Sequence, residues 1–122
     1  FPGAFTPLSA RLIEQKGFDG VYISGAVLAN DLGLPDIGLT TLTEVATRAG
    51  QIARMTDLPA LVDADTGFGE PMNVARTVQE LENAGLAGEI ARRSARKNGA
   101  GLAFSCKLRR PTNSRLIGPS CL

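Results

Sequence analysis

Hydrophobic residues along the first 88 positions follow two spacings, one typical of buried strands and the other of amphipathic helices. Short apolar runs rich in β-branched residues predict strands, and apolar residues recurring every three or four positions predict helices. In chain order the predicted segments are a helix over 7–16, a strand over 20–24, a helix of about a dozen residues from Thr41 or Thr43, a strand over 60–65, and a helix from Pro71 to Gly85. This alternation predicts parallel βα units, and therefore the α/β class.

Residues typical of turns and helix ends separate these segments. Thr6 or Ser9 is suited to cap the first helix, and Gly17 is suited to end it. A loop over 30–38 contains two glycines and a proline, which disfavour regular structure. We therefore expect one long connection, after the first strand, and short ones elsewhere.

The pattern changes after Gly88, where a third strand is expected to begin. From Glu89 onward no sustained helix or strand period remains. We expect a brief basic helix over 91–97, a short strand over 102–104, and otherwise irregular, poorly ordered chain.

Charge changes at the same point. Residues 1–88 contain 5 Lys/Arg and 11 Asp/Glu, a net charge of −6, whereas residues 89–122 contain 8 and 1, a net charge of +7. So sharp a reversal predicts two unlike parts, 1–88 and 89–122.

The composition as a whole is that of a soluble globular protein, with 43% hydrophobic and 20% charged residues. No stretch reaches the roughly 18 consecutive apolar residues of a membrane span. Cys106 and Cys121 form neither a disulfide framework nor a paired metal motif. We therefore expect a reducing, cytoplasmic setting.

Asp63 and Asp65 are the first candidates for chemistry. Residues i and i+2 of a strand share a face, and a glycine-rich turn follows this pair. Two carboxylates with room for water suit Mg²⁺ or Mn²⁺. The alternative is a pair of solvated acids at a loop edge, but the apolar run before them favours partial burial, where an unpaired charge is costly.

Other candidates lie near the end of the first strand and in the loop after it. The Ser24 hydroxyl and the backbone N–H groups of Gly25 and Ala26 could hold a substrate carboxylate, or the segment could be a simple turn. Asp36 is either a turn residue or a partner for metal-bound water. Tyr22 alternates with Ser24 on the same strand face and is a further substrate-binding candidate, although a lone strand tyrosine is more often a core residue than a ligand.

Three ordered motifs resemble one family. They are Tyr22-Ile23-Ser24-Gly25-Ala26, Leu32-Gly33-Leu34-Pro35-Asp36-Ile37-Gly38, and Leu61-Val62-Asp63-Ala64-Asp65-Thr66-Gly67-Phe68-Gly69. Over residues 1–88 the chain is similar to the 2-methylisocitrate lyases of the isocitrate lyase and phosphoenolpyruvate mutase superfamily.

The resemblance implies the N-terminal part of a (β/α)₈ TIM barrel and Mg²⁺-dependent cleavage of 2-methylisocitrate to pyruvate and succinate. It assigns the substrate carboxylate to Ser24, Gly25 and Ala26, where many relatives have Gly at the last position. It implies that Asp63 and Asp65 are metal ligands, with Asp36 beside them. For the full-length family it implies a cytoplasmic homotetramer.

The resemblance ends at Gly88. The family continues with a strand ending in Glu-Asp-Gln and a mobile Lys-Arg-Cys-Gly-His loop whose Cys is the expected acid–base residue, and neither motif is present. Cys106 has unlike neighbours and is not a substitute. One hypothesis is a frameshift. With suitable codons for residues 91–101, the neighbouring reading frame encodes Arg-Gln-Glu-Val-Ser-Pro-Lys-Lys-Arg-Cys-Gly, which resembles the missing loop.

Three hypotheses of function remain. The first is a carbon–carbon lyase by ancestry that is inactive as this chain, with no catalytic acid–base residue. The second is a related phosphonopyruvate hydrolase or oxaloacetate decarboxylase with the same metal pair. The third is a non-enzymatic product whose basic tail binds acidic partners; nucleic acid is disfavoured because the tail has one aromatic residue, Phe104.

Overall fold

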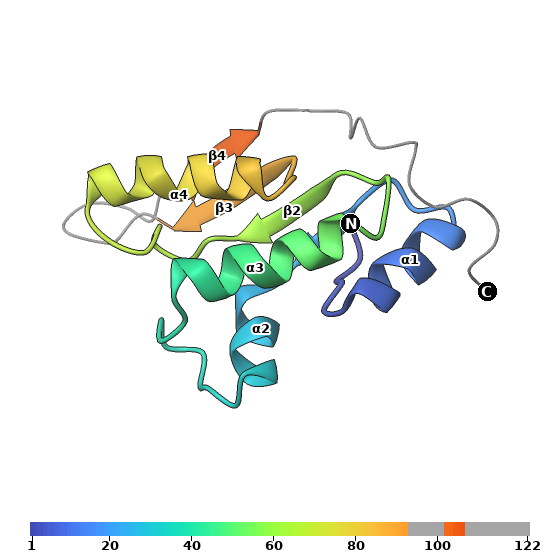
Figure 1. The fold of residues 1–122 in the computed structure, drawn as a ribbon, viewed down its shortest axis with the longest axis horizontal. Coiled ribbons are helices and arrows are strands. Elements are labelled where there is room, and N and C mark those ends of the chain that lie inside the picture. Colours follow the sequence, from blue (N-terminus) through green and yellow to red (C-terminus); the bar gives the residue numbers. More distant parts are fainter. Residues whose placement is uncertain (93–101, 107–122) are drawn as a thin grey trace.

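The computed structural model describes residues 1–92 and 102–106, which form four helices and four strands (Figure 1). The elements are α1 (Pro7–Gln15), β1 (Val21–Ile23), α2 (Gly25–Asp31), α3 (Leu42–Ala53), β2 (Ala60–Asp63), α4 (Pro71–Asn83), β3 (Gly88–Arg92) and β4 (Leu102–Cys106). No helix in these ranges is long and apolar enough to cross a membrane.

The strands form one sheet in the order β1-β2-β3-β4. β1 pairs in parallel with β2, and β2 in parallel with β3, through Val21↔Ala60 and Asp63↔Ile90 among other pairs. β4 runs antiparallel to β3. The predicted parallel βα arrangement is therefore confirmed, with an antiparallel strand added at one edge.

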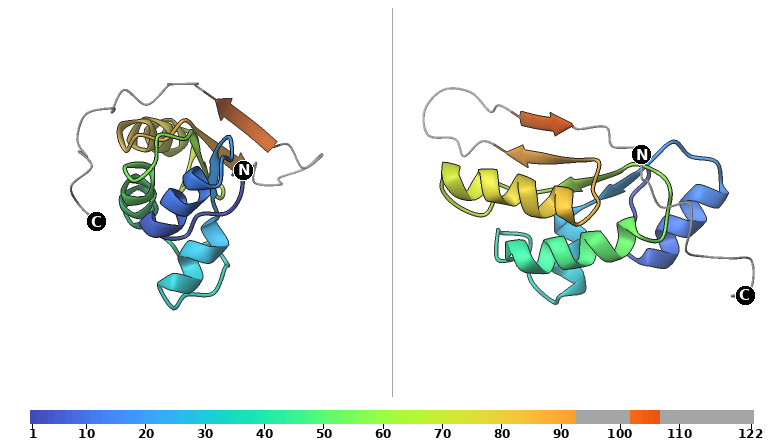
Figure 2. Two further views of the ribbon diagram at one scale, coloured as in Figure 1. Left: turned by 90° about the vertical axis from the view of Figure 1, so that its right-hand side faces the viewer. Right: turned by 45° about the horizontal axis from the view of Figure 1, so that its top comes forward.

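Alternate strand residues separate a helix-covered face from a polar one. Val21, Ile23, Ala60 and Val62 are at most 2% exposed and pack in one core with buried residues of the helices, among them Val45, Ala49, Ile52 and Leu81. Figure 2 shows α3 and α4 side by side on this face. Tyr22, Leu61 and Asp63 alternate with the core residues and are only partly buried, so a polar site can form on the opposite face.

Helix ends follow the expected capping chemistry. Thr6 caps α1 in a capping box with Ser9, and Thr41, rather than Thr43, caps α3 in a box with Glu44. Hydrogen bonds from the Thr41 backbone N–H and hydroxyl lower the pKa of the Glu44 carboxyl. Gly17, which follows α1, has a φ of +79°, as a glycine stop requires.

Helix α2 was not predicted from the sequence. We expected a loop to follow the first strand, but residues 25–31 are helical and the loop begins after them. Isolated helices this short are unstable, so tertiary contacts maintain it: Leu28 and Ala29 are buried, and Asp31 forms an ion pair with Arg48 of α3.

The region after Gly88 also differs from expectation. The basic helix predicted over 91–97 is wrong in its first two residues, Ala91 and Arg92, because they pair with β4; the rest of it lies outside the described residues. The short strand over 102–104 is confirmed as part of β4. Most of the expected irregular tail also lies outside the described residues.

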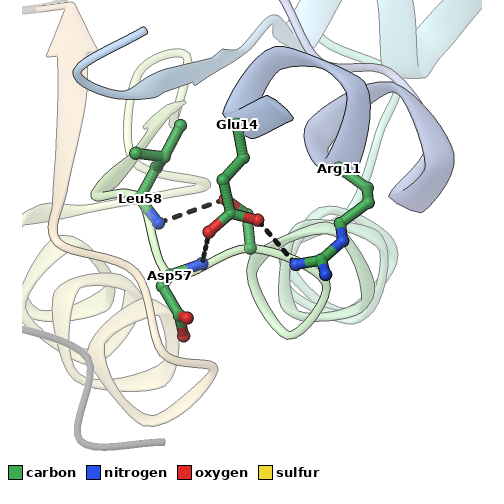
Figure 3. A network of polar contacts seen from close by, with 5 residues as sticks. Arg11, Glu14, Asp57 and Leu58 are labelled. Atoms are coloured by element: carbon green, nitrogen blue, oxygen red, sulfur yellow. Dashed lines mark hydrogen bonds and ion pairs between the residues drawn. The ribbon is translucent and has the colours of Figure 1, made fainter. Parts of the chain in front are cut away.

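A polar network joins α1 to the turn before β2 (Figure 3). Glu14 accepts a hydrogen bond from the Asp57 backbone N–H at 3.0 Å and pairs with Arg11 at 2.9 Å. The Leu58 N–H donates to the Thr56 hydroxyl oxygen at 3.1 Å. These contacts hold the chain just before β2 begins.

We predict that Glu14→Ala lowers the free energy of unfolding by about 1 kcal/mol, because it removes the acceptor of the Asp57 N–H. Urea unfolding followed by circular dichroism measures the change. Gln15→Ala, an exposed change in the same helix, should stay within about 0.5 kcal/mol of wild type. Equal stability of the two variants would show that the network does not fix this turn.

Candidate active site

A pocket of about 140 Å³ lies at the carboxyl ends of β1 and β2. Parallel pairing brings these ends to one edge of the sheet, so the segment after β1 faces the acids after β2. The pocket is lined by Tyr22, Ser24, Gly25, Ala26, Ala29, Asp36, Gly38, Thr40, Val45, Asp63, Asp65 and Phe68. All seven candidate residues from the sequence therefore line one pocket.

Asp63, the last residue of β2, is held at both carboxylate oxygens. Oδ1 accepts the Asp65 backbone N–H at 3.0 Å, and Oδ2 accepts the Tyr22 hydroxyl at 3.4 Å. Tyr22 therefore orients an acid in the pocket rather than filling the core. Each oxygen accepts one protein hydrogen bond and keeps lone-pair capacity for a further partner.

Asp65 reaches the pocket by a different route from the one we expected. β2 ends at Asp63, and Asp65 has a φ of +52°, so the two acids do not share a strand face. The left-handed region is accessible to Asp because its short side chain bonds locally. A tight turn closed by the Gly67 N–H and the Ala64 carbonyl oxygen, 2.8 Å apart, directs Asp65 into the pocket.

Two glycines lie beside the acids, at distances where an added Cβ would make ordinary van der Waals contact. A Cβ added to Gly25 would lie 3.5 Å from the Asp63 Cγ, and one added to Gly38 would lie 3.6 Å from the Asp65 Oδ2. The loop after α2 is therefore packed against Asp65. Asp36, on the same loop, is exposed and lines the pocket from its solvent side.

Several residues of the pocket lining were not predicted from the sequence. Thr40 immediately precedes the α3 cap, and Phe68 lies in the turn after β2 with a φ of +59°. Ala29 and Val45 supply apolar wall. The loop position of Thr40 gave no local signal, whereas Phe68 lay inside a motif that we had already singled out.

The acids fit a hard divalent cation held by few protein ligands. Within the described ranges, no group of three or more His, Cys, Asp or Glu side chains could enclose a metal. Mg²⁺ needs no such cage, since it binds through one or two carboxylates and takes its other ligands from water and substrate. The pair Asp63 and Asp65, with space beside it, suits that ion better than a zinc centre closed by four protein ligands.

The strand register places Cys106 away from this site. Cys106 pairs with Gly88 at the start of β3, whereas Asp63 pairs with Ile90 further along the same strand. Cys106 therefore lies toward the opposite end of the sheet from Asp63.

Two larger pockets lie between helices. One of about 360 Å³ separates α2 from α3, and one of about 400 Å³ separates α3 from α4. Each has a single carboxylate in its lining, Glu44 in the first and Glu80 in the second. Their size does not compensate for the lack of converging acids, so the smaller pocket is the candidate active site.

Comparison with known proteins gives close relatives over the same region. Two Corynebacterium glutamicum proteins named probable 2-methylisocitrate lyases are 76% and 77% identical over 87 residues, which is 71% of this chain and 28% of each relative. An oxaloacetate decarboxylase of Rhodopseudomonas palustris is 51% identical over 85 residues, which is 69% of this chain and 30% of that protein. The chain thus spans less than a third of the length of these relatives.

Solved structures give the same result for the fold. A 2,3-dimethylmalate lyase superimposes with a TM-score of 0.70 at 34% identity, over 84% of this chain and 36% of that one. A phosphonopyruvate hydrolase in complex with oxalate and Mg²⁺ gives a TM-score of 0.72 at 32% identity, over 80% and 35%. These neighbours are TIM-barrel enzymes, so the predicted class, a partial (β/α)₈ barrel, is confirmed.

The model of the phosphoenolpyruvate phosphomutase family matches residues 1–101. Taken with the relatives above, this match shows that the chain belongs to the phosphoenolpyruvate mutase family.

Proposed function

We propose that the chain carries the metal-binding and substrate-carboxylate-binding part of a Mg²⁺-dependent lyase that cleaves 2-methylisocitrate to pyruvate and succinate. The observation that carries the proposal is the single pocket lined by Asp63, Asp65, Ser24 and their neighbours. The identity of 76–77% to proteins named as probable 2-methylisocitrate lyases supports this substrate.

Asp63 and Asp65 would hold the cation, with Tyr22 fixing the direction of the Asp63 carboxylate. When bound, Mg²⁺ would stabilise the charge on the substrate 2-oxygen as a base takes the proton of that hydroxyl group, and this oxygen becomes the carbonyl oxygen of pyruvate when the carbon–carbon bond breaks. Asp36, on the solvent side, would accept hydrogen bonds from water beside the pair.

The substrate carboxylate would bind to the segment after β1. Gly25 and Ala26 are the first residues of α2, and the first N–H groups of a helix have no partner within it. Those two N–H groups and the Ser24 hydroxyl can donate to a carboxylate in the pocket. Ser24 is half-buried and its side chain accepts no cap hydrogen bond from an α2 N–H, which leaves its hydroxyl available.

Formation of the second product, succinate, requires a proton donor. Breaking the bond leaves a carbanion on the succinate portion, which must be protonated before it leaves. Among the described residues, the pocket lining contains no thiol, and Cys106 lies toward the other end of the sheet. We therefore propose that the 122-residue chain does not turn over by itself.

The test joins residues 1–88 to the remaining part of a Corynebacterium glutamicum relative and follows pyruvate release from 2-methylisocitrate with Mg²⁺. We predict turnover by the chimera and none by the 122-residue chain. In the chimera, Asp63→Asn should reduce kcat by roughly a hundredfold or more, because several kcal/mol of charge stabilisation are lost. Asp57→Asn, at an exposed turn, is the matched control.

A chimera that is inactive on 2-methylisocitrate but active on oxaloacetate or phosphonopyruvate would replace the proposed substrate. The similarities to an oxaloacetate decarboxylase and a phosphonopyruvate hydrolase favour these two as the second candidates. Turnover by the 122-residue chain would contradict the proposal that it lacks a residue able to protonate the succinate carbanion.

We also propose that residues 89–122 are read from a shifted frame, as a part distinct from residues 1–88. The charge reversal and the missing Lys-Arg-Cys-Gly-His loop support this origin. β3 crosses the boundary, so the first shifted residues still complete a strand.

Sequencing the coding DNA tests this origin. We predict a change of reading frame near codon 89, with a neighbouring frame that encodes the missing loop. A single open frame whose alternatives encode no such loop would contradict it.

A further inference from the structure

The loop over 64–69 that carries Asp65 has an unusual backbone. Asp65, Gly67, Phe68 and Gly69 all have positive φ, at +52°, +87°, +59° and +146°. For a bulky residue such as Phe68 this conformation is strained. A strained loop persists only where its surroundings determine it, so contacts from outside the loop should decide where Asp65 lies.

Helix α4 supplies such a contact through Thr77. The Thr77 hydroxyl donates to the Gly67 carbonyl oxygen at 2.9 Å, and Thr77 is only 1% exposed. The Asp63 carboxylate of β2 also accepts a hydrogen bond from this loop, at the Asp65 N–H, whereas the Thr77 hydrogen bond ties the loop to α4. It joins residues ten positions apart at the turn that directs Asp65.

Packing at the same point adds to the hydrogen bond. A Cβ on Gly67 would lie 2.6 Å from the Val74 Cγ2, so the loop backbone lies directly on α4. The Gly67 N–H is itself bonded to Ala64, within the turn. Gly67 is thus held by α4 at its carbonyl group and by its own turn at its N–H.

We propose that Thr77 is a positioning residue for the metal site, which fixes Asp65 beside Asp63 through the Gly67 carbonyl group. This inference rests on the proposed function in taking Asp63 and Asp65 as cation ligands. Helix α4 contributes no residue to the pocket lining. Through Thr77 it would nevertheless control how tightly a divalent cation binds.

The test uses Thr77→Val, which keeps the shape and loses the hydroxyl, and Thr77→Ser, which keeps the hydroxyl. Thr47→Val, on the exposed side of α3, controls for the substitution itself. Two properties of the full 122-residue chain are measured: Mn²⁺ affinity by electron paramagnetic resonance, and amide hydrogen exchange without metal.

Thr77→Val should weaken Mn²⁺ binding about tenfold, as loss of a group that orients a ligand does. The Asp65 and Gly67 amides should exchange about tenfold faster. Thr77→Ser and Thr47→Val should match wild type in both. If Thr77→Val does not fold, Thr77→Ser and Thr77→Ala, which both lack the methyl group, differ only in the hydroxyl and should show the same contrast.

Equal Mn²⁺ affinity in hydroxyl-bearing and hydroxyl-lacking variants would overturn the inference and leave the proposed function intact. If the wild-type chain does not bind Mn²⁺, the proposed metal site fails and the inference fails with it. Faster exchange throughout α4, without a selective change at the loop, would show a purely structural role and would also overturn the positioning role.

Discussion

The parallel pairing of β1 with β2 is the constraint on which the site depends. Because Tyr22 lies opposite Leu61 and both strands run the same way, the residues after β1 and the last residue of β2 reach one edge of the sheet. The same register lets the Tyr22 hydroxyl contact Asp63, 41 residues later. Slippage by one residue would turn Asp63 towards the helices and Val62 away from the core.

Burial of apolar residues on the helix side enforces that register. Val21, Ile23 and Val62 are fully buried against α3 and α4, and burial of such side chains is worth about 1.5–3 kcal/mol each. The polar residues alternate with them and therefore face the other way. The hydrophobic pattern thus supports the chemistry indirectly, by holding the strand ends together and leaving the carboxylates accessible.

Much of this arrangement could be predicted from local sequence, because strand and helix periods, capping threonines and glycine stops act over a few residues. Most of the pocket candidates followed from their positions at strand ends, and Asp36 from the loop motif that contains it. The short helix α2 could not be predicted, since the burial of Leu28 and Ala29 requires distant segments to pack over them, and its ion pair with Arg48 is partly exposed. The contacts of Tyr22 with Asp63 and of Thr77 with Gly67 likewise required knowledge of which distant segments meet.

Mn²⁺ binding by the wild-type chain and by Asp63→Asn tests most directly whether this edge of the sheet is a metal site. The account predicts saturable binding by the wild-type chain, at least about tenfold weaker binding by Asp63→Asn, and unchanged binding by Asp19→Asn, at an exposed position before β1. Equal affinity of all three chains would contradict the account, since the bound cation would then lie elsewhere.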